Sequence, residues 1–230
     1  MDRINLKLPI RTSQAAANAF SLIELLVVIA IIALLTAFAL PAFNSIGQAR
    51  GVSEAAYQVA AAVEMARSEA ITRQTYVWLG LQNQTNSGNQ DLRIGMVYSK
   101  DGTTSTTAAN LQPIGRAFLI QRAGLVDPSV LQVSGLPSGT VLSGLPSILA
   151  NSTGATFSIG QAGFTSTTVT VTPAGEFLLN SPATASATTT GFDPKIAIGL
   201  RQFRGTTASV DNDVAIIIDG SVGIPTIYRK

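Results

Sequence analysis

The sequence contains no histidine and no cysteine, and only 12% of its 230 residues are charged. Without these two side chains the chain has no Ser-His-Asp triad, no Cys-His pair, no zinc-finger site and no disulfide. It also lacks a GxGxxG motif and a Walker loop. No pair of carboxylates is singled out for hydrolysis, and residues 128–175 hold no charge at all. We therefore expect no enzyme activity, no catalytic residue and no cofactor.

The few charges are unevenly placed along the chain. The first 19 residues carry Arg3, Lys7 and Arg11 against Asp2, whereas from Phe20 onward twelve positive side chains are balanced by twelve negative ones. Binding to nucleic acid needs several positive charges that are not offset by negative ones. A generally basic nucleic-acid protein is therefore excluded, and no nucleic-acid partner is expected.

The C-terminal region holds the remaining candidates for ionic chemistry. Its positive side chains are Arg201, Arg204, Arg229 and Lys230, and the aspartates among them are Asp211, Asp213 and Asp219. These aspartates offset most of the positive charge, so we do not expect this region to bind DNA. Carboxylates are also the ligands that Ca²⁺ prefers, but aspartates in a turn more often serve as solvated turn formers. We therefore expect no metal site.

One long apolar run dominates the N-terminal part. Leu25–Leu40 is apolar except for Thr36, and no charge follows before Arg50. A helix of about 20 apolar residues spans a bilayer, and the run reaches this length when residues 41–46 are included. The basic residues before the run favour a cytoplasmic N-terminus under the positive-inside rule. The sequence thus predicts a transmembrane helix over residues 20–46 and an exported body after it.

A cleavable secretory signal peptide is the alternative reading of this N-terminus. Ala37-Phe38-Ala39 has the small-x-small pattern of a signal-peptidase site. Glu24 favours retention of the helix instead. A carboxylate that enters hydrocarbon is costly, and a disposable segment gains nothing from that cost. A retained helix can pair the charge with a partner.

The segment Ala19–Leu26 (AFSLIELL) resembles the processing site of type IV prepilins and type II secretion pseudopilins. The resemblance implies that a membrane prepilin peptidase cuts between Ala19 and Phe20 and methylates the new amine of Phe20. Residues 1–19 would then be a basic leader peptide. The family usually has glycine before the cut, where this chain has Ala19.

The same resemblance implies roles for two residues inside the apolar helix. Glu24 is implied to pair with the amine of a neighbouring subunit's Phe20 during assembly. An unpaired carboxylate and an unpaired amine are each costly in lipid, and pairing them removes both costs. Such a pair would favour one axial stagger between subunits. Pro41 falls where the family often has a helix-kinking proline.

An apolar stripe continues the helix beyond the predicted membrane span. Its members recur every three or four residues, which places them on one helical face. They are Val52, Ala56, Val59, Val63, Ala66 and Ala70. Residues 47–74 are therefore expected to be an amphipathic continuation that leans on a globular domain, within one helix over residues 21–74.

From residue 75 onward, Gly, Thr, Ser and β-branched residues replace the helix signals. Short segments separated by turn signals predict an antiparallel β domain over residues 75–230. The expected strands cover residues 75–81, 92–99, 116–121, 130–134, 155–159, 168–172, 176–179, 197–203, 213–219 and 222–228. Loops are expected at 82–91, 101–113, 135–153 and 180–193, and tight turns at 173–175 and at Asp219-Gly220.

Two further segments resemble the H-type minor pseudopilins and related minor pilins. They are residues 66–73 (ARSEAITR), just before the first strand, and residues 171–175 (VTPAG), which resemble a later turn of that family. The resemblance implies an α+β pilin-like fold with a long N-terminal helix packed on a C-terminal antiparallel β domain. It also implies the function of a minor pilin or pseudopilin, a structural subunit of a type II secretion or type IV pilus-like filament.

The implied partners are prepilin peptidase, other pilin or pseudopilin subunits and the membrane. The implied location is the inner membrane, crossed once with the C-terminal domain outside the cytoplasm, and the pilus or pseudopilus after assembly. The alternative function is a secreted or membrane-tethered β-rich binding module, similar to an adhesin, that forms no filament. Replacing Glu24 distinguishes the two, because it would abolish assembly only for a filament subunit.

Overall fold

The computed structural model describes residues 21–149, 154–179 and 194–230, without the side chains of residues 37–50, Ser166 and Asp211. The chain forms two compact units, Met1–Asn44 and Ser45–Lys230. The first unit contains the beginning of helix α1 (Leu22–Arg73), and the second contains the rest of α1 and the strands. The continuous helix predicted over residues 21–74 is confirmed.

Helix α1 ends in a Schellman motif. Gln74 adopts a left-handed conformation with φ 51°. The Thr75 N–H donates to the Ala70 carbonyl (3.1 Å) and the Gln74 N–H to the Ile71 carbonyl (3.3 Å). The side-chain amide of Gln74 donates a further bond to the Ile71 carbonyl (2.6 Å). These bonds satisfy the carbonyls of Ala70 and Ile71 near the end of the helix, and the chain then turns into the first strand.

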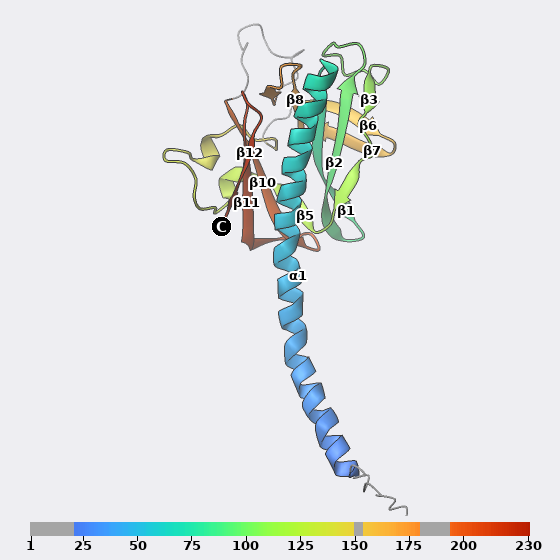
Figure 1. Ribbon diagram of the computed structural model, residues 1–230, viewed down its shortest axis with the longest axis vertical. Coiled ribbons are helices and arrows are strands. Elements are labelled where there is room, and N and C mark those ends of the chain that lie inside the picture. The colour runs from blue at the N-terminus through green and yellow to red at the C-terminus, as the bar shows by residue number, and fades with distance from the viewer. Residues whose placement is uncertain (1–20, 150–153, 180–193) are drawn as a thin grey trace, which may run out of the picture. The chain divides into compact units, whose positions relative to one another are not determined.

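Two antiparallel sheets and a separate hairpin form the β part of the second unit. The first sheet has the order β3-β2-β1-β8-β9 with β4 also paired to β2, the second has the order β12-β11-β10-β5, and the hairpin is β6-β7. The strands are β1 (Val77–Asn86), β2 (Asn89–Ser99), β3 (Leu111–Pro113), β4 (Phe118–Ile120), β5 (Ala123–Val126), β6 (Gly154–Ile159), β7 (Ala162–Ser166), β8 (Thr168–Val171), β9 (Phe177–Leu178), β10 (Lys195–Arg204), β11 (Thr207–Asp219) and β12 (Pro225–Arg229). In Figure 1, β1 and β2 lie on one side of α1 and β10 to β12 on the other.

The main core lies where the helix meets both sheets. All six residues of the predicted apolar stripe on α1 are buried in it, together with inward-facing residues of both sheets. On β11, Val214, Ile216 and Ile218 belong to this core, while the alternating Ala215 and Ile217 pack in a separate cluster. A slip by one residue would exchange these two faces, so the buried face fixes the register of the strand.

The β6–β7 hairpin packs on the first sheet through two phenylalanines. The rings of Phe157 and Phe164 stack with their centroids 5.0 Å apart. Gly80 and Gly95 lie opposite each other in the β1–β2 ladder. A methyl group on Gly80 or Gly95 would lie 2.6 or 2.5 Å, respectively, from an atom of the Phe164 ring. The paired glycines therefore provide the space in which the ring lies.

The prediction of a loop at residues 82–91 is wrong. Strand pairing continues to Asn86 opposite Asn89, and only Ser87 and Gly88 form the connection. Both have positive φ, 48° and 79°, which matches the type I′ turn that suits the twist of a hairpin. The polar side chains suggested a loop, but backbone pairing with β2 stabilises them as an exposed hairpin end.

The prediction of a strand at residues 130–134 is also wrong. The segment begins with the 3-10 helix η1 (Pro128–Val130), and irregular backbone follows. Backbone groups of Val130 and Gln132 bond to a buried ion pair of the second sheet instead of to a neighbouring strand. The other nine expected strands each overlap an observed one.

Strands β3, β5 and β7 were not expected from the sequence, and β3 falls within the loop predicted at 101–113. Strand β5 pairs with β10 and is also held by Asn83 of β1. The Asn83 Oδ1 atom accepts from the Leu125 N–H (2.6 Å), and its Nδ2 donates to the Leu125 carbonyl (2.9 Å). These partners lie 42 residues apart, so no local pattern reveals the strand. The loop predicted at 180–193 lies outside the described residues.

Candidate functional site

The predicted processing and assembly residues lie at the start of α1. Ala19 and Phe20 lie outside the described residues, whereas Glu24 is in the first helical turn. The Glu24 Oε2 atom accepts from the Ser21 N–H at 2.9 Å, and the Glu24 N–H donates to the Ser21 Oγ at 3.3 Å. This reciprocal pair is a capping box, which satisfies two backbone donors at a helix start. This local role of Glu24 was not predicted, although the S-x-x-E spacing carries its signal.

The helix that follows Glu24 has an apolar and exposed surface. Every residue from Leu22 to Thr36 is exposed, and all of them except Glu24 and Thr36 are apolar. The Thr36 hydroxyl donates to the Ile32 carbonyl at 2.6 Å, so this one polar group is satisfied within the helix. Among the described parts of the chain, no helix was found with the length and apolar character of a membrane span. The span over residues 20–46 stays a prediction.

The backbone of α1 is helical through Pro41. Its side chain lies outside the described residues, so the kink expected at Pro41 also stays a prediction.

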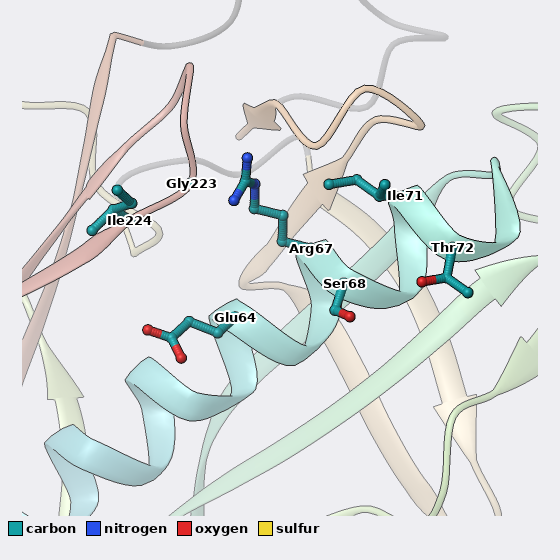
Figure 2. A pocket seen from close by; sticks show the side chains of 7 residues that line it. All are labelled: Glu64, Arg67, Ser68, Ile71, Thr72, Gly223 and Ile224. Carbon is teal, nitrogen blue, oxygen red and sulfur yellow. The ribbon is translucent and has the colours of Figure 1, made fainter.

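A second candidate site brings together the two segments that resemble the minor pseudopilins. Arg67 of the 66–73 segment lies against Gly175 of the 171–175 turn and against Gly223, which follows β11. A pocket of about 370 Å³ opens beside Arg67. Figure 2 shows the Arg67 side chain rising from α1 toward Gly223, with Ile71 and Ile224 at its sides. Nothing in the local sequence reveals this approach, because it joins three distant segments.

Two local turns hold the glycines that lie against Arg67. The predicted turn at 173–175 is confirmed, since the Gly175 N–H donates to the Thr172 carbonyl at 2.8 Å. The turn predicted at Asp219-Gly220 is also confirmed, and Asp219 organises it. The Asp219 Oδ1 atom accepts from the Ser221 hydroxyl (2.6 Å) and from the Ser221 N–H (3.0 Å). The Ser221 hydroxyl bond is the main cause that lowers the pKa of Asp219 below its ordinary value.

Arg67, which is half-buried, and Arg201, which is buried, differ in their hydrogen-bond partners. The Asp213 carboxylate accepts from the Nε (2.7 Å) and Nη2 (2.9 Å) of Arg201, and it also accepts from the Gln132 N–H (2.8 Å). The Arg201 Nη2 further donates to the Val130 carbonyl at 3.1 Å. By contrast, the Nε of Arg67 is buried and has no hydrogen-bond partner among the described residues.

These contacts also bear on the aspartates considered as calcium ligands. The carboxylates of Asp213 and Asp219 are both engaged with protein donors, and the Asp211 side chain lies outside the described residues. Among the residues that the structure describes, no group of three or more acidic side chains is arranged to hold a metal. Arg201 is likewise engaged by Asp213 and is not free to bind a phosphate.

Two family profiles match the chain. The profile described as type II transport protein GspH matches residues 55–191, which is more than half of the chain. The matched range includes Arg67 and the 171–175 turn. The profile described as prokaryotic N-terminal methylation motif matches residues 15–40 and includes Phe20 and Glu24. No curated protein and no solved structure matches the chain.

Proposed function

Because the chain belongs to the GspH family of type II transport proteins, we propose that it is anchored in the inner membrane and joins a secretion pseudopilus through its N-terminal helix. The chain is a GspH-type minor pseudopilin of type II secretion that carries the prepilin-type methylation motif. The family is structural, so the chain is a filament subunit and not an enzyme. This favours the subunit over the adhesin-like binding module.

The observation that carries the proposal is the exposed apolar surface of α1 directly after Glu24. A continuous apolar surface of this kind is unfavourable in water and marks a membrane or protein contact. In the membrane it is covered by lipid, and in the filament by the apolar helices of neighbouring subunits. The small side chains of Ala30 and Ala33 allow such helices to approach closely.

Processing supplies the group that Glu24 needs. Prepilin peptidase cuts between Ala19 and Phe20, which removes the basic leader of residues 1–19 and leaves a methylated amine on Phe20. Glu24 then pairs with the amine of a neighbouring subunit's Phe20, and this contact sets the axial stagger of the subunits. The capping bond uses the Oε2 atom of Glu24, and its Oε1 has no partner among the described residues, so one carboxylate oxygen is available for the amine.

Successive segments of the chain have different roles in this proposal. Residues 20–46 lie in the membrane, with the kink at Pro41, and residues 47–74 continue the helix into the exported domain of residues 75–230. Burial of the apolar stripe of α1 in the core of the second unit ties the exported strands to the anchoring helix. The partners are prepilin peptidase, the other pseudopilins and the inner membrane.

The mass and N-terminal sequence of the mature protein, purified from a membrane fraction, test the proposal. A chain that begins at methylated Phe20 is expected. A chain that begins at Leu40 would show cleavage after Ala37-Phe38-Ala39 and would overturn the pseudopilin anchor. A chain that still begins at Met1 would show that Ala19 prevents processing, and this too would contradict the proposal.

A further inference from the structure

We propose that the pocket beside Arg67 receives a carboxylate side chain of a neighbouring pseudopilin. The proposal rests on the pseudopilin function given above and assigns a contact chemistry to one surface of the exported unit. The evidence is the position of the Arg67 side chain, the lack of an acceptor for it and the two exposed isoleucines, Ile71 and Ile224, that line the pocket.

Arg67 is held in place before any partner arrives. An added methyl group on Gly223 would lie 2.6 Å from the Arg67 Cδ, and one on Gly175 would lie 3.1 Å from its Nε. Both glycines also have positive φ, 67° and 84°, a conformation that other residues rarely adopt. The arginine stem therefore passes between two positions where only glycine fits well. A side chain fixed in this way loses little entropy when it binds a partner.

The guanidinium of Arg67 has no acceptor within the described chain. Its Nε is buried without a hydrogen bond, and neither of the two ion pairs found among the described residues includes it. Arg93, which is also half-buried, donates to the Gln84 side chain, and Arg201 is paired with Asp213. A buried donor without an acceptor is unfavourable. A carboxylate that enters the pocket matches the planar fork of an arginine and would give this guanidinium an acceptor.

Glu64 does not supply this carboxylate from the same helix. It lies three residues before Arg67 and lines the same pocket. Its side chain is exposed, and it makes no ion pair among the described residues. Figure 2 shows Glu64 and Arg67 extending from α1 in different directions. No carboxylate of the described residues therefore forms an ion pair with Arg67.

The rim of the pocket indicates the kind of partner. Ile71 and Ile224 line the pocket and are 38% and 59% exposed, and the adjacent Val222 is 43% exposed. Arg67 is the one positive side chain among the described residues of the lining. Nucleic acid needs several positive charges in a row, so a single arginine beside Glu64 and two exposed isoleucines fits it poorly. The arrangement fits an acidic residue that lies beside an apolar one on a protein surface, as at a subunit contact with a buried charge.

Site-specific photo-crosslinking in cells that make the complete secretion machine tests this proposal on the full-length chain. The photoreactive residue replaces Ile224 at the rim. In the control it replaces Val210, which is equally exposed at 59% but lies toward the other end of β11. Adducts are identified by mass spectrometry in the wild-type, Arg67→Lys and Arg67→Gln backgrounds. Cofractionation of the chain with the other pseudopilins is measured separately.

We expect an adduct from position 224 to another pseudopilin, with an acidic residue in the cross-linked peptide. Its yield should fall about tenfold in Arg67→Gln and fall less in Arg67→Lys, while adducts from position 210 stay unchanged. Reversing the charge of the acidic residue in the partner leaves this chain untouched and should lower the adduct equally. Combining that reversal with Arg67→Glu should restore it.

Three results would overturn the proposal. The adduct from position 224 could be insensitive to Arg67→Gln and to the reversal in the partner. Position 224 could give an adduct only with an exported substrate protein. It could also give no pseudopilin adduct although the chain cofractionates with the other pseudopilins. If the wild-type chain does not cofractionate with them at all, the proposed function itself fails, and this readout separates the two failures.

Discussion

Replacing Glu24 with glutamine separates the two roles that the structure and the sequence give to this side chain. Glutamine at this position of a capping box still accepts from the Ser21 N–H, so the helix start is kept while the charge is lost. Ser21→Ala does the reverse. It removes a capping bond worth about 1 kcal/mol. Because this bond is lost equally in the free and in the assembled subunit, the free energy of assembly should change little.

The size of the effect depends on the cost of an unpaired charge in lipid. On insertion scales an ionised carboxylate costs about 2.5–3.5 kcal/mol at the centre of a membrane helix. Pairing with an amine relieves up to this amount. Glu24→Gln removes the cost from the free subunit and with it the driving force for pairing. We expect a loss on the order of 100-fold in the association constant between subunits.

The assay compares the yield of assembled pseudopili from cells that express the wild-type chain, Glu24→Gln, Ser21→Ala or the double variant. All variants must accumulate in the membrane to similar levels. Assembly should be abolished in Glu24→Gln and in the double variant, and it should persist in Ser21→Ala. Normal assembly of Glu24→Gln would refute the charge pairing, and an equal loss in Ser21→Ala would show that the cap, and not the charge, is what matters.

Three further predictions concern the second unit, Ser45–Lys230. Asp213→Ala leaves the buried Arg201 unpaired and should lower the free energy of unfolding, measured by chemical denaturation, by about 3–5 kcal/mol. Replacing both Arg201 and Asp213 with apolar residues should lower it by less. Gly95→Ala places a methyl group 2.5 Å from the Phe164 ring and should destabilise by about 1–3 kcal/mol, whereas alanine at Gly144, where nothing lies within 4 Å, serves as the control. Hydrogen bonds, first of all from the Thr103 hydroxyl, lower the pKa of Asp101 to about 2 from 3.8. The ionised carboxylate therefore contributes stability that is fully present above the pKa of the unfolded chain and is lost as the pH falls through about 2. An NMR titration of the Asp101 carboxyl group with a midpoint near 3.8 would contradict this.

The elements that the sequence predicted well are those with a local periodic signal. The stripe from Val52 to Ala70 recurs at helical spacing, and the structure buries all of it. The turn at Gly175 needs a residue that tolerates φ 84°, and Pro173 and Gly175 mark it in the sequence. The hairpin tip at Ser87-Gly88 was missed because its strands are polar there, and cross-strand pairing, not burial, stabilises them.

The candidate sites divide in the same way. The processing motif was predicted because its residues are contiguous in the sequence and resemble a known pattern, which the methylation-motif profile also matches. The assembly roles of Phe20 and Glu24 stay predictions. The Arg67 pocket was not found, although both of its family-like segments had been noted. Their meeting depends on the packing of α1 against the turns that hold Gly175 and Gly223.

By itself, the sequence determined the long helix, its apolar first half, its buried stripe, the antiparallel character of the strands after the helix and the family to which the chain belongs. Each of these depends on residue types at short, regular spacing. Only the tertiary structure decided that Asn83 holds β5, that Arg201 and Asp213 organise the segment around Val130, and that Arg67 lies unpaired between two glycines. These contacts join residues many positions apart, and the packing of the core, which no local pattern encodes, brings them together.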